Sequence, residues 1–244
     1  MTEETRALLV DIEGTVTPIS FVHDILFPFA RAHVRDYLVQ HSNNEHVQED
    51  IAALRREHSI SRKAGEQPPK VDDVSTIDQI VAYVSWLIDR DRKSPALKSL
   101  QGKIWEAGYR ERTLKAPLFS DVVPNLGRLR RQGIAVAIFS SGSVLAQKLL
   151  FAHTETGDHT DLIDEYFDTA VGSKVNSESY VGIARRLELR PQEVMFVSDV
   201  TSELMAARET GMATLLCVRP GNQPQSASEQ FKVIHSFSEI LSTT

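Results

Sequence analysis

The chain has 244 residues, of which 41% are hydrophobic and 25% are charged, as in a globular protein with a sizeable core. The net charge of −6 and the absence of a basic block argue against nucleic acid as a partner. Cys217 is the only cysteine and lies in an apolar run, so it is predicted to be a core residue. Residues 1–6 carry acids where a signal peptide carries bases, and no apolar run reaches membrane-spanning length. We expect a cytoplasmic protein that does not engage a membrane and, for want of a coiled-coil pattern, a monomer.

A short apolar run, Ala7–Val10, leads into a segment that holds Asp11, Glu13, Gly14 and Thr15. Such a run ending on a carboxylate is typical of a buried strand that carries an acid to the edge of a sheet. Asp11 and Glu13 alternate at the strand end, so both can face one crevice. Gly14 lets the backbone turn, and Thr15 offers a hydroxyl and an N–H to an anion. A surface turn has the same composition, so the rest of the chain must decide.

Residues 21–116 show helical periodicity and no convincing strand. Apolar residues at three- and four-residue spacing predict helices over 21–38, 45–58 and 77–88. Pro28 should kink the first of them or end its first piece. Ser94 followed by proline is typical of the start of a fourth helix. The stretch 59–73, with one glycine and two prolines, is predicted to be a polar loop.

From about Leu118 onward, short apolar runs alternate with helical patterns. Strands are predicted over 134–139, 167–171, 194–197, 213–218 and 233–234. One helix is predicted to begin at Asp121, which can act as an N-cap, and to end at Gly133. Three more are predicted: one that contains Leu145, one that begins at Asn176 or Ser177, and one over 201–210. Buried strands alternating with helices predict an α/β fold, a Rossmann-like parallel sheet with helices on both faces. If the first strand joins this sheet, residues 1–20 and 117–244 form the core domain and 21–116 an inserted all-helical cap domain.

Four predicted strands end on, or run towards, groups that suit phosphoryl chemistry. The first ends on Asp11, the second on Ser140, the third runs towards Lys174, and the fourth ends on Asp199. In open parallel sheets, ligands bind at the carboxyl ends of the strands. Two carboxylates hold a hard divalent cation such as Mg²⁺, and the N–H groups after Ser140 form an anion nest. Lys174 adds a positive charge that gains in effect as charge develops in a transition state.

With these residues in view, the chain resembles the haloacid dehalogenase-like phosphatases over nearly its whole length. The matching pattern is DIEGT at 11–15, FSSG at 139–142, Lys174 and SD at 198–199. The family's second acid is usually Asp, whereas this chain has Glu13. This departure is typical of one branch of the family, the enolase-phosphatases (acireductone synthases) of methionine salvage. The chain also resembles that branch in two further segments, TPISFVHD at 17–24 and VRPGN at 218–222.

The resemblance implies a role for each matching residue. Asp11 would be the nucleophile and Glu13 the general acid and base. Asp11, the backbone carbonyl of Glu13 and Asp199 would hold Mg²⁺, while Ser140, the N–H of Ser141 and Lys174 would hold the phosphoryl oxygens. Branch members enolise 2,3-diketo-5-methylthiopentyl-1-phosphate and then remove its phosphate, giving 1,2-dihydroxy-3-keto-5-methylthiopentene.

Other interpretations stay open at this point. A phosphatase of the same family that acts on another small phosphorylated metabolite would keep the mechanism and lose the enolisation. A dehalogenase would share the nucleophilic aspartate but needs no metal. The pairing of Glu13 with Asp199 suits a metal site and so argues against a dehalogenase. A non-catalytic phosphate-binding regulator on the same fold would have no need of a nucleophile, an acid, a lysine and a metal-binding acid together. Glu203, one helical turn after Asp199, is expected either to orient Lys174 or a metal-bound water, or to be a solvent-facing acid.

Overall fold

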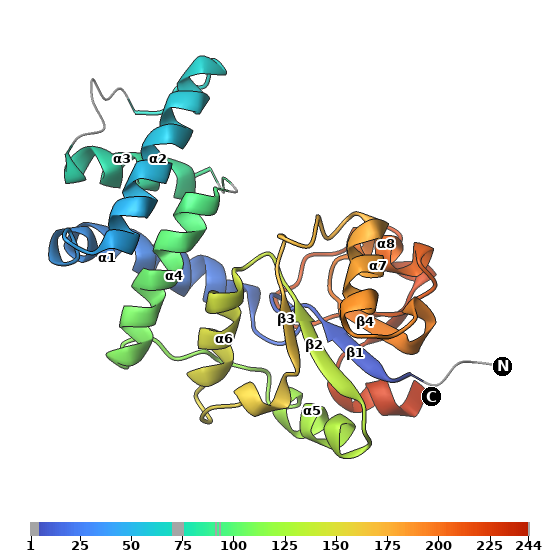
Figure 1. Ribbon diagram of the computed structural model, residues 1–244. Coiled ribbons are helices and arrows are strands. Elements are labelled where there is room, and N and C mark those ends of the chain that lie inside the picture. Colours follow the sequence, from blue (N-terminus) through green and yellow to red (C-terminus); the bar gives the residue numbers. More distant parts are fainter. Residues whose placement is uncertain (1–4, 70–75, 91, 93, 244) are drawn as a thin grey trace. The chain divides into compact units, whose positions relative to one another are not determined.

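The computed structural model describes residues 5–69, 76–90, 92 and 94–243 (Figure 1). The chain divides into two compact units, one made of residues 1–22 with 115–244 and the other of residues 23–114. Within the described residues, no helix is long and apolar enough to cross a membrane. The prediction that residues 1–6 are not a signal peptide concerns mostly residues 1–4, which lie outside the described part of the chain.

The larger unit contains a six-stranded sheet in the order β3-β2-β1-β4-β5-β6. The strands are β1 (Ala7–Val10), β2 (Ala135–Phe139), β3 (Glu165–Phe167), β4 (Val194–Ser198), β5 (Ala213–Cys217) and β6 (Lys232–Ile234). All five neighbouring pairs are parallel, and Leu9 of β1 lies opposite Ala137 on one side and Phe196 on the other. The predicted parallel α/β sheet is therefore confirmed.

The strand order places β1 at the point where the chain changes direction across the sheet. The connections from β1 lead to β2 and β3 on one side, and the chain then crosses to β4, β5 and β6 on the other. All four residues of β1 are buried, which explains the unbroken apolar run Ala7–Val10. In open α/β sheets, the crevice outside the carboxyl ends at such a switch point is the usual ligand site.

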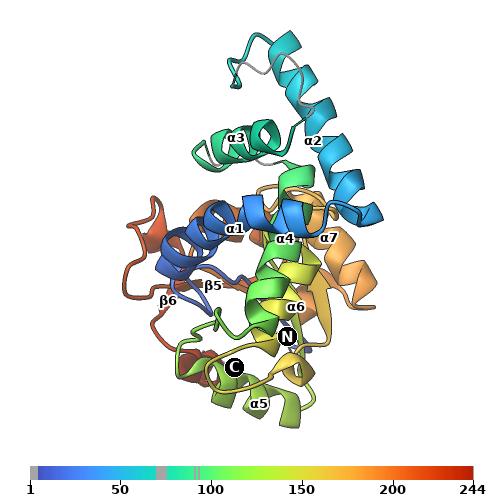
Figure 2. The same cartoon turned by 90° about the vertical axis from the view of Figure 1, so that its left-hand side faces the viewer.

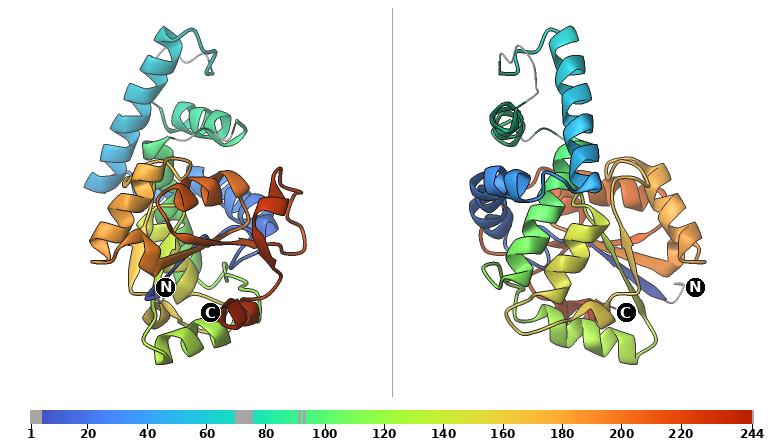
Figure 3. Two further views of the ribbon diagram at one scale, coloured as in Figure 1. Left: turned by 90° about the vertical axis from the view of Figure 1, so that its right-hand side faces the viewer. Right: turned by 60° about the vertical axis from the view of Figure 1, so that its left-hand side comes forward.

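Helices cover both faces of this sheet (Figures 1 and 3). Helices α7 (Ser177–Arg186) and α8 (Thr201–Glu209) pack on one face, where Tyr180 and Leu204 join alternate strand residues such as Leu9 and Phe139 in one core. Helices α5 (Val122–Arg131) and α6 (Val144–Ala152) cover the other face. The opposite-facing residues between the core positions are buried as well, so the strands show no polar alternation.

In its described residues, the second unit contains four α-helices (Figure 2). They are α1 (Phe27–Gln40), α2 (Glu45–Lys63), α3 (Ile77–Ile88) and α4 (Pro95–Arg110). Helices α1 and α2 each pack against both α3 and α4. Ser94 caps α4 as the sequence predicts, because its Oγ accepts a hydrogen bond of 2.9 Å from the N–H of Leu97.

Two local predictions for the helices need correction, and one is confirmed. Helix α2 continues to Lys63, beyond the predicted start of a polar loop at 59, and buries His58 and Ser61; residues 70–73 of that loop lie outside the described part. The prediction for Pro28 is confirmed, because the helical segment has two pieces that meet beside it. A π-helical piece ends at Leu26, and Pro28 lies in the first turn of α1, where a missing N–H is tolerated.

The second correction concerns Asp121, which does not cap α5 with its side chain. Its carboxylate instead accepts two hydrogen bonds from Arg219, at 3.0 and 2.9 Å, and one of 2.7 Å from the N–H of Phe237. A buried guanidinium offers a carboxylate a bidentate, charged partner, which is stronger than a helix N–H. These hydrogen bonds hold the pKa of Asp121 below its usual value although partial burial opposes the shift.

Candidate active site

The loop after β1 is held together by its own backbone. The carbonyl of Ile12 accepts hydrogen bonds from the N–H groups of Thr15, Val16 and Thr17, at 3.2, 2.9 and 3.1 Å. The N–H of Gly14 donates to the carbonyl of Thr17 at 2.9 Å. Gly14 has a φ of +69°, which glycine adopts without the steric cost that a Cβ brings. The loop is therefore a tight turn at the carboxyl end of the central strand.

Asp11 and Lys174 form a buried ion pair at this edge of the sheet. The ammonium Nζ of Lys174 lies 2.5 Å from Oδ1 of Asp11 and 2.7 Å from Oε2 of Glu203. Both Asp11 and Lys174 are less than 10% exposed. The hydroxyl of Tyr180 donates a hydrogen bond of 2.6 Å to the carbonyl of Lys174, which fixes the backbone from which the lysine side chain extends. Glu203 thus orients Lys174, one of its two expected roles, while Ser198 Oγ donates to Glu203 at 3.0 Å.

Lys174 reaches the site from a loop and not from a strand. The third strand was predicted over 167–171, but β3 ends at Phe167, and Lys174 lies between it and α7. The prediction was wrong because β3 is an edge strand, where Glu165 is exposed and Tyr166 half-buried, so its sequence lacks an unbroken apolar run.

Burial and charge shift the pKa values of three groups at the site. Burial, together with the nearby charges of Asp11 and Glu203, raises the pKa of Asp199 to about 7, although Lys174 opposes the shift. Burial and the charge of Asp11 raise the pKa of Glu203 to about 7 as well. Burial alone would lower the pKa of Lys174, but Asp11 and Glu203 raise it above its ordinary value. Lys174 is therefore a permanent cation among acids that resist ionisation.

Asp199 follows β4 and lies against the loop after β1. A Cβ atom added to Gly14 would be 2.8 Å from Cγ of Asp199 and closer still to its Oδ2. Asp199 is only 6% exposed, and the charge of Asp11 reaches it. Only a glycine at position 14 leaves room for this carboxylate, so the loop after β1 can pack closely against the side chain of Asp199.

Ser140 and Ser141 begin the loop that follows β2. Ser140 is buried, and its Oγ accepts a hydrogen bond of 3.1 Å from the N–H of Gly142. Ser143 caps α6 by accepting a hydrogen bond from the N–H of Ala146. Gln147, which the sequence analysis missed, donates from Nε2 to the carbonyls of Gly142 and Phe167, both at 2.9 Å. This buried amide ties the serine loop to the end of β3; its position one turn into α6 was the available signal.

Thr15 does not offer its N–H to an anion, since that group already donates to Ile12 within the turn. The side chain is fully buried, and among the described residues its Oγ1 has no hydrogen-bond partner. Thr15 contributes its carbonyl instead, which accepts a hydrogen bond of 3.2 Å from Nε of Arg219. Glu13 is half-buried in the same turn, where it forms a β-bridge with Thr17.

Arg219 and Asn222, beyond β5, are further residues that sequence reasoning did not place at the site. Nδ2 of Asn222 donates a hydrogen bond of 2.9 Å to the carbonyl of Gly14. Both residues follow a strand of the same parallel sheet, so their side chains belong to the same edge as Asp11. That position after a strand was the signal that could have identified them.

The donor set at this edge fits a hard divalent cation. No group of three Asp, Glu, His or Cys side chains that could hold a metal is found within the described part of the chain. A cation here would therefore take the carboxylates of Asp11 and Asp199 together with backbone oxygen. Because the N–H of Gly14 points to Thr17, the carbonyl of Glu13 in the same trans peptide points the opposite way. A divalent cation would stabilise the ionised form of Asp199, whose pKa is raised.

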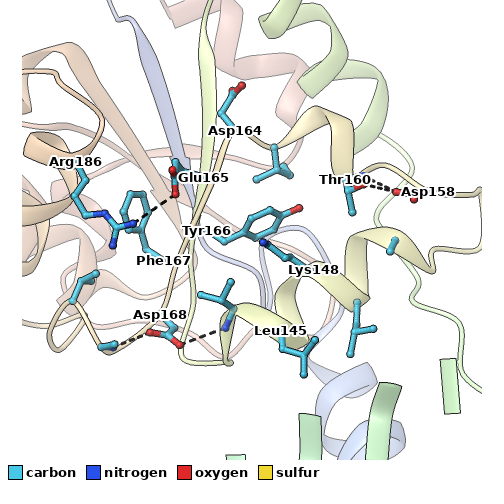
Figure 4. A pocket seen from close by; sticks show the side chains of 16 residues that line it. Leu145, Lys148, Asp158, Thr160, Asp164, Glu165, Tyr166, Phe167, Asp168 and Arg186 are labelled. Atoms are coloured by element: carbon cyan, nitrogen blue, oxygen red, sulfur yellow. Dashed lines mark hydrogen bonds and ion pairs between the residues drawn. The ribbon is translucent and has the colours of Figure 1, made fainter. Parts of the chain in front are cut away.

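A pocket of about 900 Å³ lies elsewhere on the same unit, around α6 and the edge strand β3 (Figure 4). Its lining includes Lys148, Tyr166 and Asp168, whereas Asp11, Lys174 and Asp199 are not among its lining residues. Asp168 accepts hydrogen bonds from the N–H groups of Val144 and Ala170, at 3.4 and 2.9 Å, which connects α6 to the loop after β3. The pocket therefore does not contain the groups gathered at the strand ends.

Comparison with known proteins gives a consistent family. A family model for haloacid dehalogenase-like hydrolases matches residues 5–211. Enolase-phosphatase E1 of Synechococcus elongatus is 47% identical over 235 residues, covering 96% of each chain, and that of Danio rerio is 41% identical over 248 residues, covering 98% of this chain and 95% of its own. The crystal structure of the Saccharomyces cerevisiae UTR4 protein is 34% identical, has a TM-score of 0.77 and covers 96% of this chain and 98% of its own. The chain thus belongs to the haloacid dehalogenase-like hydrolases and, among them, to the enolase-phosphatase E1 family.

Proposed function

We propose that this protein converts 2,3-diketo-5-methylthiopentyl-1-phosphate into 1,2-dihydroxy-3-keto-5-methylthiopentene and phosphate, as a Mg²⁺-dependent enolase-phosphatase of methionine salvage. The observation that carries the proposal is the buried ion pair between Asp11 and Lys174 at the carboxyl edge of the sheet, with Asp199 and Glu203 beside it. Enolase-phosphatase E1 relatives that match nearly the whole chain support the substrate and both steps.

Asp11 acts as the nucleophile in the phosphatase step. Its carboxylate oxygen attacks phosphorus, an aspartyl-phosphate forms, and the bond between phosphorus and the enol oxygen breaks. Glu13 gives a proton to the departing oxygen and then takes one from the water that hydrolyses the aspartyl-phosphate. The water oxygen leaves with the phosphate, and Asp11 is regenerated.

Lys174 and the serine loop bind the phosphoryl group. Ser140 and the N–H of Ser141 donate to its oxygens at the entrance of α6, where helix N–H groups favour an anion. Lys174 faces the charge that grows on those oxygens in the transition state, and burial strengthens this interaction relative to water. Asp11, Asp199 and the carbonyl of Glu13 would hold Mg²⁺, which supplies a second positive charge for the phosphoryl oxygens. Thr15 shapes the loop through its carbonyl.

The enolase step precedes the phosphatase step and needs one proton to leave carbon and one to reach a carbonyl oxygen. Glu13 is the group at this edge that we assign to this transfer, since it is half-buried and lies two residues after the nucleophile. The helical unit of residues 23–114 is assigned the role of a cap that excludes water and contacts the methylthio tail. The proposal includes a cytoplasmic, monomeric enzyme.

The deciding experiment follows the products of the diketo phosphate by mass spectrometry. With Mg²⁺ present, an enol phosphate should build up before phosphate is released. Release of phosphate without an enol intermediate would favour the alternative, a family phosphatase that acts on another small phosphorylated metabolite.

A variant separates catalysis from mere phosphate binding. Asp11→Asn keeps the size of the side chain but removes the nucleophile, so phosphate release from an aryl phosphate should fall by about 10³-fold or more. The wild type is measured with and without Mg²⁺, and circular dichroism confirms that the variant folds. A wild type that releases no phosphate under either condition would support a non-catalytic phosphate-binding regulator.

A further inference from the structure

Two side chains from the segment after β5 hold the loop that carries Glu13. Asn222 donates from Nδ2 to the carbonyl of Gly14 at 2.9 Å, and Arg219 donates from Nε to the carbonyl of Thr15 at 3.2 Å. On the other side of the same two peptide groups, the N–H groups of Thr15 and Val16 donate to the carbonyl of Ile12. Both consecutive peptides are thus held at both ends.

Arg219 is itself fixed and has little freedom to move with the loop. It is 6% exposed, and its guanidinium donates to both carboxylate oxygens of Asp121 and, at 2.8 Å, to the carbonyl of His235. The guanidinium also lies over the rings of Phe119 and Phe237, at 4.5 and 5.3 Å from their centroids. A planar cation held by a bidentate carboxylate and two rings is a rigid support.

Asn222 and Asp199 both lie against Gly14. A Cβ added to Gly14 would be 3.0 Å from Oδ1 of Asn222 and would also meet the carboxylate of Asp199, so both side chains face the same side of Gly14. Asn222 is held in turn by its N–H, which donates to the carbonyl of Arg219 at 3.1 Å. A shift of the Asn222 amide therefore changes the position of the turn and its spacing from Asp199.

We propose that Arg219 and Asn222 are positioning residues for the reaction, holding the carbonyls of Gly14 and Thr15 so that Glu13 and Asp199 keep their places around the divalent cation. This inference rests on the proposed function. Neither residue contacts a reacting atom in this scheme. They act through the peptide groups on the C-terminal side of Glu13. Residues around metal sites act in the same way when they hydrogen-bond to the metal ligands and orient them.

Asn222→Ala is the primary test, because Asn222 is half-buried and neutral and its loss leaves no buried charge. The affinity of the protein for Mg²⁺ should fall about tenfold in isothermal titration calorimetry without substrate. With an aryl phosphate, kcat should fall by a similar factor while KM changes less, since the phosphoryl-binding groups remain. Hydrogen exchange of the amides of residues 14–17 should become faster.

Arg219→Lys is the second variant, since lysine keeps the charge beside Asp121 but cannot donate to the Thr15 carbonyl and both carboxylate oxygens in one plane. Arg208→Lys is its matched control, because Arg208 likewise donates to a backbone carbonyl, that of Gln230, and lies over the ring of Phe231. The control, at an exposed residue, should lose no more stability than Arg219→Lys in thermal melts and should keep the wild-type affinity for Mg²⁺.

The outcomes separate the two proposals. A wild type that binds no Mg²⁺ and releases no phosphate would contradict the proposed function. A wild type that does both, with Asn222→Ala and Arg219→Lys each within twofold of it in Mg²⁺ affinity and kcat, would overturn the positioning role alone. Loss of Mg²⁺ affinity in Arg208→Lys equal to that in Arg219→Lys would also overturn it, because the effect would then not depend on a hydrogen bond to the turn after β1.

Discussion

At the scale of single residues, the site has more negative than positive charge of its own. Lys174 lies against Asp11 and Glu203, and the charge of Asp11 also reaches Asp199, so three carboxylates share one ammonium. Arg219 adds nothing to this balance, because Asp121 pairs with it. A phosphate dianion entering such a site would be repelled unless another cation were present. This charge balance supports the proposed requirement for a divalent cation.

The length of the Glu13 side chain leads to a prediction about the two half-reactions. Glutamate has one more methylene than the aspartate usual in the family, so its carboxylate reaches about 1 Å further, a distance that matters for near-attack geometry. We expect that reach to allow proton transfer at carbon as well as at the leaving oxygen. Glu13→Asp should therefore slow enolisation more than it slows hydrolysis of a simple phosphate ester.

Rapid-quench mass spectrometry with the diketo phosphate measures enolisation, and phosphate release from an aryl phosphate measures hydrolysis. Glu13→Gln is the control, since it keeps the length and removes the acid, and both reactions should then fail. Equal losses in both reactions for Glu13→Asp would show that the extra methylene has no special role.

At the scale of elements, the turn after β1 is shaped by what surrounds it. Gly14 has a φ of +69°, and a Cβ there would meet Asp199; Gly133 has a φ of +79°, and a Cβ there would meet nothing within 4 Å. Alanine at either position should cost about 1–2 kcal/mol from backbone strain. Only Gly14→Ala should also lower Mg²⁺ affinity and kcat, by about tenfold or more, because it displaces Asp199.

Chemical denaturation gives the stability of both alanine variants, and calorimetric titration gives their affinity for Mg²⁺. Gly133→Ala serves as the control for strain alone. If the two variants lost the same stability and both kept the wild-type affinity for Mg²⁺, the close contact between the turn and Asp199 would have no role in the site.

The sequence predicts the buried elements better than the edges. Strands β1, β2 and β4 are buried on both faces, so their apolar runs mark them, and the polar residues that end them mark the site. The edge strand β3 was misplaced because its pairing with β2, and not its own composition, defines it. Contacts between distant segments, such as that of Asp121 with Arg219, depend on the folded arrangement and leave no local pattern.

The same limit applies to the site. Asp11, Lys174 and Asp199 are brought together as their order on the strands predicts. The N–H of Thr15 was assigned to an anion, but a tight turn uses that group internally. Gln147 and Asn222 act through backbone carbonyls, so their positions near strand ends are the signal in the sequence and their hydrogen-bond partners are known only from the fold.

At the scale of the whole molecule, the acids at the site should make the stability of the metal-free protein depend on pH. The pKa of Asp199 is raised from 3.8 to about 7 and that of Glu203 from 4.5 to about 7. Between these values the folded state binds more protons than the unfolded state, so stability falls as pH rises. This contribution is fully present below about pH 4 and is lost as pH rises through about 7.

Thermal melts without metal should therefore show a melting temperature lower by roughly 3–6 °C at about pH 8 than at about pH 5, from a free-energy change of the order of 1–2 kcal/mol. Asp199→Asn cannot ionise, so it should flatten this slope and be more stable than the wild type at the higher pH.

Asp158→Asn is the control: its carboxylate is exposed, and hydrogen bonds from Thr160 lower its pKa, so it titrates below this range. Saturating Mg²⁺ should reduce the slope in the wild type, because the cation holds Asp199 ionised, and should not stabilise Asp199→Asn to the same degree. Parallel pH profiles of wild type and Asp199→Asn, with equal stabilisation by Mg²⁺, would show that Asp199 neither carries the raised pKa nor binds the cation.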